Sequence, residues 1–323
     1  MRGVGPGREE AGATARAPLF TGTANPGLAE AVARALGRRV GACAVERFPD
    51  GEVSVRFEEP IRGCDVHILQ PTSPPVDANL MELLAMVDAA RRAGARRVVA
   101  IVPYFGYARS DSRHGRREPL LARLVADLLE TAGVDEIVTL DPHTDQLEGF
   151  FRIPVHAVTA VPVLVPAVRP LVAAGAVVVS PDAGRVEMAG RYAAELGTEL
   201  AVLHKRRRTG AEVEAIGLSG DVRGRNCVLI DDMISTGGTL VEAARVLREA
   251  GARPGFVAVA THGLLVDGAL EKLAAADIKR VLVTDSVAPR HEASTAVQVV
   301  SIAPLIADAL REIRAGEAPA ARE

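Results

Sequence analysis

Short apolar runs alternate with longer amphipathic segments along most of this chain of 323 residues. The runs are rich in β-branched residues, which favours strands at Val66–Gln70, Val98–Val102, Glu136–Leu140, Ala176–Ser180, Cys227–Ile230, Gly255–Ala260 and Arg280–Thr284. The spacing of apolar residues predicts helices at Asn79–Ala93, Leu120–Ala132, Val186–Leu196, Thr239–Ala250 and Gly268–Ala275. Strands that alternate with helices in this way build parallel sheets, so we predict an α/β fold.

The length of the chain predicts about two domains. Prolines at positions 162 and 166 interrupt the apolar stretch Val158–Val168, and we place the junction there. Residues 18–162 are expected to form the first domain and residues 163–303 the second. Residues 1–17 lack the apolar core of a secretory signal and are expected to form a disordered extension.

Composition excludes several classes of protein. Hydrophobic residues make up 48% and charged residues 24% of the chain, which is typical of a globular protein. With 38 basic and 41 acidic residues, the net charge of −3 gives no field that would attract nucleic acid or an anionic membrane. No apolar run approaches the roughly 18 residues of a membrane helix. The three scattered cysteines suggest neither a disulfide framework nor a zinc site, and we expect a cytoplasmic protein.

Lysine is rare in this chain. Only Lys205, Lys272 and Lys279 are lysines, and the other 35 of the 38 basic residues are arginines. Lys205 stands in the sequence HKRRRTG, beside three arginines, where a further arginine would also supply positive charge. The composition therefore singles out Lys205 for inspection, although it does not by itself assign a role.

The most specific segment is NCVLIDDMISTGGTLVEAARVL, residues Asn226–Leu247. A buried strand is expected to end at Asp231 and Asp232, and a loop with two glycines then leads into a helix. Backbone N–H groups of such a loop and the positive end of the helix form an anion-binding cradle. The two carboxylates suit a sugar phosphate, whose hydroxyls or Mg²⁺ would face them. The alternative is a tight strand–helix turn with Asp232 as a solvated cap.

This segment resembles the phosphoribosyl-pyrophosphate (PRPP) loop of type I phosphoribosyltransferases and of the ribose-phosphate pyrophosphokinase (PRPP synthetase) family. The N-terminal half favours the second family, since RFPDGE (Arg47–Glu52), the run Asn79–Asp111 and DPHTDQLEGFF (Asp141–Phe151) all resemble it. VVSPDAG (Val178–Gly184) and KRR (Lys205–Arg207) do so as well, and the similarity covers roughly Leu19 to Arg314.

The resemblance implies two phosphoribosyltransferase-like (type I) domains with parallel central sheets and an active site between them. It implies that a C-terminal helix at 304–314 packs back onto the ATP-side first domain, and that the chain forms a homo-oligomer, a dimer or hexamer. The implied activity is transfer of the pyrophosphoryl group of ATP to the 1-hydroxyl of ribose 5-phosphate, with Mg²⁺. A weak or silent paralogue that regulates such enzymes, and a relative that uses another sugar phosphate, are the alternatives.

The resemblance also implies roles for individual residues. The residues that would bind ATP are Phe48, Asp50, Glu52, Arg109, Ser110 and Asp111. His143 and Asp182 correspond to metal ligands, with Asp141 expected to support His143. Lys205 and Arg207 would be catalytic, and the residues that would bind ribose 5-phosphate are Arg207, Asp231, Asp232, Ser235, Thr236, Gly237, Gly238 and Thr239. Without the resemblance, PDGE is only a turn signal.

Several positions depart from the family pattern. Ser110 replaces a glutamine, Leu121 lacks a hydroxyl, and Ser235 stands where many bacterial members have aspartate. Arg185 and Met188 break the usual run PD-x-GG-x-x-R, so that an arginine replaces its second glycine. These departures concern mainly the nucleotide side and the subclass, and they leave the ribose-phosphate positions largely intact.

Overall fold

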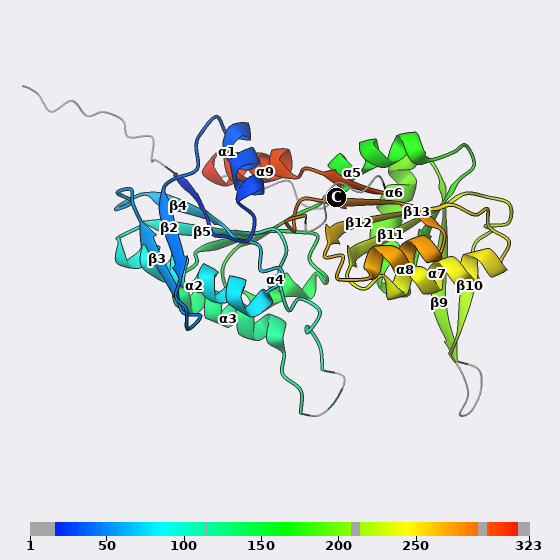
Figure 1. Ribbon diagram of the computed structural model, residues 1–323, viewed down its shortest axis with the longest axis horizontal. Helices are drawn as coiled ribbons and strands as arrows, with labels where there is room; N and C mark the ends of the chain where they lie inside the picture. The colour runs from blue at the N-terminus through cyan, green and yellow to red at the C-terminus, as the bar shows by residue number, and fades with distance from the viewer. Residues whose placement is uncertain (1–16, 114, 116, 208–213, 290–295, 316–323) are drawn as a thin grey trace, which may run out of the picture.

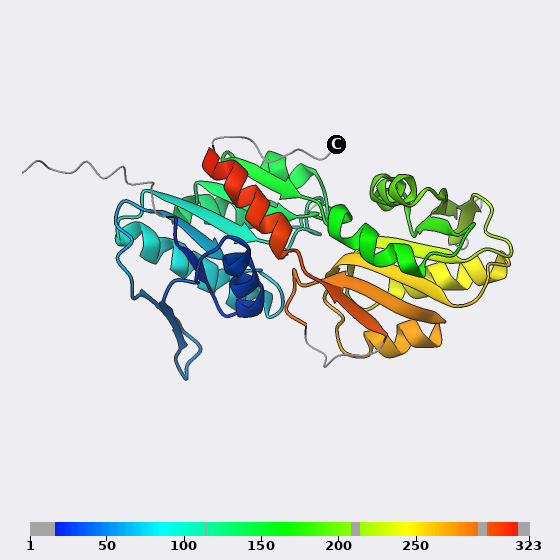
Figure 2. The ribbon, with the colours of Figure 1, turned by 90° about the horizontal axis from the view of Figure 1, so that it is seen from above.

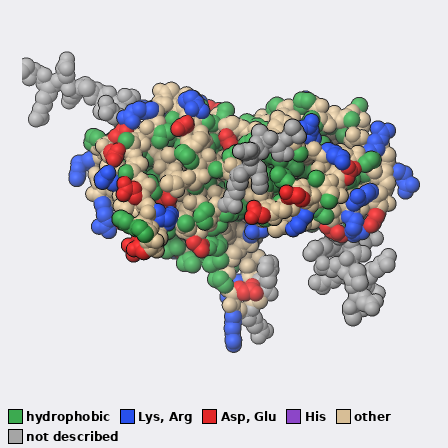
Figure 3. Space-filling view, in the orientation of Figure 1, with side chains coloured by type: hydrophobic (Ala, Val, Ile, Leu, Met, Phe, Trp, Pro, Cys, Tyr) green, Lys and Arg blue, Asp and Glu red, His purple; other side chains and the backbone are tan. Residues whose placement is uncertain are grey.

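The computed structural model describes residues 17–113, 115, 117–207, 214–289 and 296–315, with only the backbone at 205–207 and 214–216. Two α/β domains lie side by side, each with a central sheet and helices on both faces (Figures 1 and 2). Acidic and basic side chains are interspersed over the face that Figure 3 shows. Among the described residues, no helix is both long and apolar enough to cross a membrane.

The sheet of the first domain is entirely parallel, with the order β1-β4-β5-β6-β7. Its strands are β1 (Leu19–Thr21), β4 (Asp65–Leu69), β5 (Arg97–Val102), β6 (Glu136–Leu140) and β7 (Val155–Val158). One face carries α1 (Pro26–Ala35) and the C-terminal helix α9 (Ala303–Ala315), which packs against α1 and β7. The other carries α2 (Val76–Arg92) and α3 (Leu121–Ala132), with the short α4 (Gln146–Phe150) beside α3.

An antiparallel hairpin, β2 (Cys43–Arg47) and β3 (Val53–Phe57), projects from the first domain and contacts α2 (Figure 2). Its tip is a tight turn in which the Gly51 N–H donates to the Phe48 carbonyl at 2.9 Å. Gly51 has φ +94°, a conformation that glycine adopts readily. The RFPDGE motif is therefore the turn of a hairpin.

The second domain has the strand order β10-β9-β8-β11-β12-β13-β14. Its strands are β8 (Val177–Ser180), β9 (Glu199–Arg207), β10 (Glu214–Ser219), β11 (Cys227–Ile234), β12 (Phe256–Gly263), β13 (Ile278–Thr284) and β14 (Val297–Val300). Helices α5 (Val161–Val168) and α6 (Val186–Leu196) cover one face, and α7 (Gly238–Glu249) and α8 (Ala269–Ala275) cover the other. The short 3₁₀ turns Arg169–Leu171 and Ala183–Arg185 adjoin α5 and α6.

Sequence reasoning did not identify the edge strand β10, which pairs with β9 in the antiparallel direction. The chain from Arg207 to Glu214 is too short for the crossover of a dozen or more residues that parallel pairing requires. The other neighbours in this sheet are parallel. The second domain is therefore a parallel sheet with one antiparallel edge strand.

Alternate residues of each central strand enter different cores. In β5, Val98, Ala100 and Val102 face α2 and α3, whereas Val99 and Ile101 face α1 and α9. This alternation is the two-residue period of a strand, and burial on both faces explains the continuous apolar runs in the sequence. The α1–α9 core continues beneath α5 and α6 of the second domain, so one apolar layer spans both sheets.

The predicted strands and helices are all present, and their ends differ by a few residues. Strand β11 continues through Asp231 and Asp232 to Ile234, because the equally long β12 pairs with it as far as Gly263. The proline-rich junction is itself helical as α5, with Pro162 in the first turn, where its missing N–H costs no hydrogen bond. Ala17 is buried and its carbonyl accepts from Arg38 at 2.7 Å, so it belongs to the folded part.

Candidate active site

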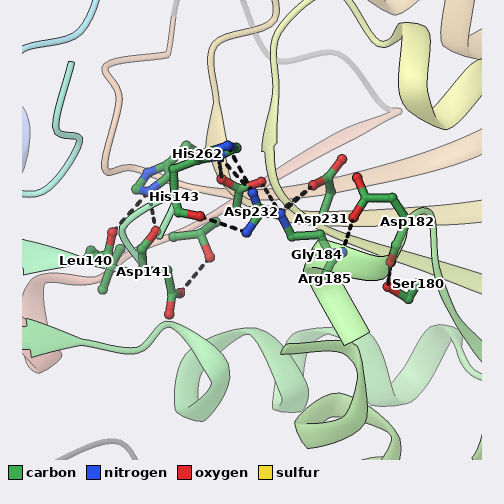
Figure 4. Close-up of polar contacts among 11 residues, drawn as sticks. Leu140, Asp141, His143, Ser180, Asp182, Gly184, Arg185, Asp231, Asp232 and His262 are labelled. Atoms are coloured by element: carbon green, nitrogen blue, oxygen red, sulfur yellow. Dashed lines mark hydrogen bonds and ion pairs between the residues drawn. The ribbon is translucent and has the colours of Figure 1, made fainter. Parts of the chain in front are cut away.

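Polar residues at the carboxyl ends of β6, β8, β11 and β12 meet between the two sheets (Figure 4). This is the edge at which open parallel sheets bind ligands. A cavity of about 160 Å³ lies here. It is lined by Arg109, His143, Asp182, Arg185 and all residues from Asp231 to Leu240. The structure thus brings together most of the residues that the sequence predicted for the site.

The loop between β11 and α7 forms one wall of this cavity. Gly237 stands at the N-cap of α7 with φ +76° and has no side chain to accept hydrogen bonds from the first turn. Thr236, Gly238 and Thr239 are exposed. Because unpaired N–H groups and the helix dipole make a helix N-terminus attractive to anions, this wall is suited to bind a phosphate.

The two aspartates of β11 are buried beside Arg185. The Arg185 Nε lies 3.0 Å from Asp232 Oδ1 and 3.6 Å from Asp231 Oδ1. Asp232 is only 1% exposed, so the alternative interpretation of it as a solvated cap is wrong. Its burial places a carboxylate in the floor of the cavity, where an arginine compensates its charge.

The two carboxyl groups titrate differently. Burial alone would raise the pKa of Asp232, but the hydrogen bond with His143 and the charge of Arg185 lower it to about 2. Burial and the neighbouring Asp232 charge raise the pKa of Asp231 well above its usual value. Of the two carboxyl groups, Asp232 is therefore the one that is ionised, and its negative charge is balanced by the nearby Arg185.

His143 lies between Asp232 and Arg185. Its Nδ1 is 2.7 Å from Asp232 Oδ2, and its carbonyl accepts from Arg185 at 2.9 Å. A second guanidinium nitrogen of Arg185 is 2.8 Å from Nδ1 and 3.2 Å from Nε2. If this nitrogen lay in the plane of the ring, its distances to Nδ1 and Nε2 would make it overlap the ring carbon between these two atoms. The guanidinium therefore lies over the face of the His143 ring, an arrangement that arginine favours.

The carboxylate that supports His143 is Asp232, and the expectation of Asp141 in that role is wrong. Asp141 Oδ2 instead accepts from the Ala160 N–H at 2.9 Å and from the Thr261 hydroxyl at 2.7 Å. Both contacts are buried. Asp141 therefore ties the end of β6 to the second domain and does not orient His143.

His143 and Asp182 were the predicted metal ligands. Asp182 is exposed, and its carboxylate accepts from the Gly184 N–H at 2.8 Å. Among the residues that the structure describes, no three His, Cys, Asp or Glu side chains are close enough to hold a metal ion. The Arg185 guanidinium, a fixed positive charge, also lies against the His143 ring. As arranged here, these residues do not fit a divalent ion.

The predicted nucleotide-binding residues divide into two groups. Arg109 is exposed and lines the 160 Å³ cavity, while Asp111 lines an adjacent cavity of about 300 Å³. Ser110 Oγ accepts from the Leu121 N–H at 3.3 Å, at the start of α3. Phe48, Asp50 and Glu52 are exposed at the tip of the β2–β3 hairpin, and the structure does not bring them to the cavities.

Lys205 and Arg207 lie in β9, and their side chains fall outside the described residues. The backbone of this strand pairs in parallel with β8, with Val202 opposite Ser180. Residues beyond Val202 therefore continue past the carboxyl end of β8, the same edge at which Asp182 begins the following turn. The catalytic roles of Lys205 and Arg207 stay predictions.

Two residues that sequence reasoning did not select join the domains at the floor of the site. His262 is buried, with Nε2 3.0 Å from the Leu140 carbonyl and Nδ1 2.9 Å from Ser286 Oγ. Its ring meets Tyr104 edge-on at 5.1 Å. Together with Thr261 it directly follows the predicted strand Gly255–Ala260, so inspection of the positions after each strand would have found both.

Comparison with known proteins gives consistent results. Residues 17–133 match the N-terminal domain of ribose phosphate pyrophosphokinase, and residues 208–321 match the phosphoribosyl synthetase-associated domain. The ribose-phosphate pyrophosphokinase of Ralstonia nicotianae is 46% identical over 302 residues, which cover 93% of this chain and 95% of that protein. That of Thermotoga maritima is 43% identical over 300 residues, 92% of this chain and 94% of that protein.

The chain belongs to the ribose-phosphate pyrophosphokinase family. The fold agrees, because the phosphoribosylpyrophosphate synthetase of Mycobacterium smegmatis superimposes with a TM-score of 0.87 at 43% identity. The match covers 93% of this chain and 99% of that one. Both domains are therefore shared with this family, which confirms the family resemblance and the two-domain α/β fold predicted from the sequence.

Proposed function

We propose that this protein is a ribose-phosphate pyrophosphokinase, which transfers the pyrophosphoryl group of ATP to the 1-hydroxyl of ribose 5-phosphate. The observation that carries this proposal is the anion cradle at the start of α7 next to the buried Asp231–Asp232 pair. A sugar phosphate has an anionic end for the cradle and hydroxyls for the carboxylates. Family membership over more than nine-tenths of the chain supports the same reaction.

On the ribose side, the 5-phosphate is proposed to bind the N–H groups of the loop Ser235–Thr239 at the N-terminus of α7. Asp231 and Asp232 would accept hydrogen bonds from the ribose hydroxyls. Arg207 is proposed as a further phosphate contact, since its planar guanidinium can bind two phosphate oxygens at once. These contacts would hold the 1-hydroxyl in a fixed position, which is the main contribution that a protein makes to such a transfer.

In the transfer itself, the 1-hydroxyl oxygen forms a bond to the β-phosphorus while the bond from that phosphorus to the α-phosphate oxygen breaks. The products are PRPP and AMP, and the hydroxyl proton passes to water. Arg109 at the cavity rim and Lys205 are proposed to stabilise the negative charge that develops on the phosphates. Lysine suits this task as a compact and movable charge.

The family implies a metal requirement, which we assign to Mg²⁺ as the counter-ion of ATP. Magnesium keeps water ligands and commonly binds through substrate phosphates, so it does not need a complete cage of protein ligands. It would neutralise phosphate charge. The roles proposed above for the protein residues do not pass through it.

We also propose that the protein is a homo-oligomer, a dimer or hexamer, in the cytoplasm. Phe48, at the tip of the β2–β3 hairpin, is 49% exposed, which is a high value for an aromatic side chain. Met81, Leu124 and Leu128 on α2 and α3 are also exposed. These exposed apolar side chains suit contact with a second copy of the chain, which supports the proposal of an oligomer.

The test is a reaction of the purified protein with ATP, Mg²⁺ and ribose 5-phosphate, in which AMP and PRPP are measured together. We expect equal amounts of both products. Bound ATP without AMP would contradict the proposal and favour a silent regulatory paralogue, whereas AMP formed only with another sugar phosphate would change the substrate. Lys205→Arg is expected to lose most turnover and keep its melting temperature, and near-normal activity would refute the role of Lys205.

A further inference from the structure

Arg185 holds the centre of the site in a way that the family pattern does not account for. It replaces the second glycine of the PD-x-GG run, and its side chain is only 14% exposed. It lines both the 160 Å³ and the 300 Å³ cavities. Figure 4 shows it in contact with His143 and with the two aspartates of β11.

The contacts of this guanidinium are those of a bound cation. One nitrogen pairs with Asp232, a second donates to the His143 carbonyl, and a third lies over the His143 ring. A buried carboxylate pair requires a positive partner, and Arg185 supplies it from within the chain. Because an arginine does not lose its proton in proteins, this positive charge is permanent.

We infer that Arg185 is a built-in cation that replaces a divalent ion beside His143 and Asp232. A metal ion bound to the His143 ring would lie within a few ångströms of the guanidinium that covers the ring. Two positive charges at that distance repel each other strongly in a partly buried site. The same guanidinium also occupies an oxygen of Asp232 that a metal ion would need.

The inference concerns the protein without substrates, so it does not rest on the proposed function. Its test is Mn²⁺ binding to the full chain, measured by electron paramagnetic resonance and by calorimetry, with neither ATP nor ribose 5-phosphate present. The variants are His143→Ala, Arg185→Gly, which restores the residue of the family run, and Arg185→Gln, which removes the charge and retains more of the side chain. Arg191→Gln is the matched control, since Arg191 lies nearby on α6 and pairs with Glu187 at 2.9 Å.

We expect the wild-type protein and Arg191→Gln to bind Mn²⁺ only weakly, with no contribution from His143. Arg185→Gly is expected to gain one site per chain with at least tenfold tighter binding, and His143→Ala in that background is expected to remove it. Arg185→Gln should show the same gain if Arg185→Gly fails to fold. Stoichiometric binding to the wild-type protein that His143→Ala abolishes would overturn the inference, as would folded Arg185 variants with unchanged binding.

Discussion

Replacement of Asp232 by asparagine tests the charge arrangement of the site. Asp232 is buried and pairs with Arg185 at 3.0 Å and with His143 at 2.7 Å. Its pKa of about 2 is nearly two units below the usual value of 3.8. At about 1.4 kcal/mol per unit, the ionised carboxylate contributes roughly 2 kcal/mol to the free energy of unfolding at neutral pH.

Asp232→Asn is therefore expected to lower the free energy of unfolding by about 2 kcal/mol at pH 7. For a protein of this size, whose unfolding entropy is large, that loss corresponds to a decrease in melting temperature of roughly 3 °C. The contribution is present above the unfolded pKa of Asp232 and is lost as the pH falls towards its folded pKa, because the folded form resists protonation. Calorimetry at pH 7 measures the difference.

Asp231→Asn is the matched control for this prediction. Burial and the Asp232 charge raise the pKa of Asp231, so its ionised form is disfavoured in the folded protein. Removal of its charge is expected to leave the melting temperature unchanged or slightly higher. Equal losses in the two variants would refute the assignment of the compensated charge to Asp232.

Three further predictions concern other features. Gly237→Ala is expected to lower the free energy of unfolding by about 1–2 kcal/mol, because φ is +76° and a Cβ would lie 3.1 Å from Leu273. The same variant is expected to bind ribose 5-phosphate more weakly in calorimetry. The control is Gly238→Ala, whose Cβ meets only Thr236 at 3.6 Å and which should change stability and binding less. Burial lowers the pKa of His67 to about 4, so the folded protein resists protonation of this side chain as the pH falls. Between pH 7 and pH 4, the free energy of unfolding of the wild-type protein should therefore fall by up to about 3 kcal/mol more than that of His67→Gln. An equal pH dependence of the two unfolding free energies would contradict this. Thr261→Val removes one of the hydrogen bonds to the buried Asp141, and chemical denaturation should show a free energy of unfolding that is about 2 kcal/mol lower. The control Thr131→Val removes an exposed hydrogen bond and should lower the free energy of unfolding by under about 0.5 kcal/mol.

Apolar periodicity predicted the central strands because each of them is covered by helices on both faces. Val98–Val102 is completely buried, so its sequence is a continuous apolar run. The edge strand β14, with the sequence VQVV, and the hairpin β2–β3 have mixed burial and no such run. Helix α1 was also missed, although Asn25 at its N-cap followed by Pro26 is a recognised start signal.

Sequence reasoning could predict those site residues that belong to a recognisable motif at the end of a strand. All residues of the loop Ser235–Thr239 line the cavity because they adjoin one strand and one helix. The role of Arg185 could not be predicted, since its partners His143 and Asp232 are distant in sequence and meet it only in the folded chain. Its departure from the family pattern was the only signal.

The polar floor of the site is also the joint between the domains. Thr261 bonds Asp141, His262 bonds the Leu140 carbonyl, and Arg185 bonds the His143 carbonyl; each contact joins the first domain to the second. A change in any of these groups would alter the relative position of the two substrates as well as stability. Arg109, Thr236 and Thr239 are exposed, so we expect substitutions there to change substrate binding and turnover and to leave the melting temperature nearly unchanged.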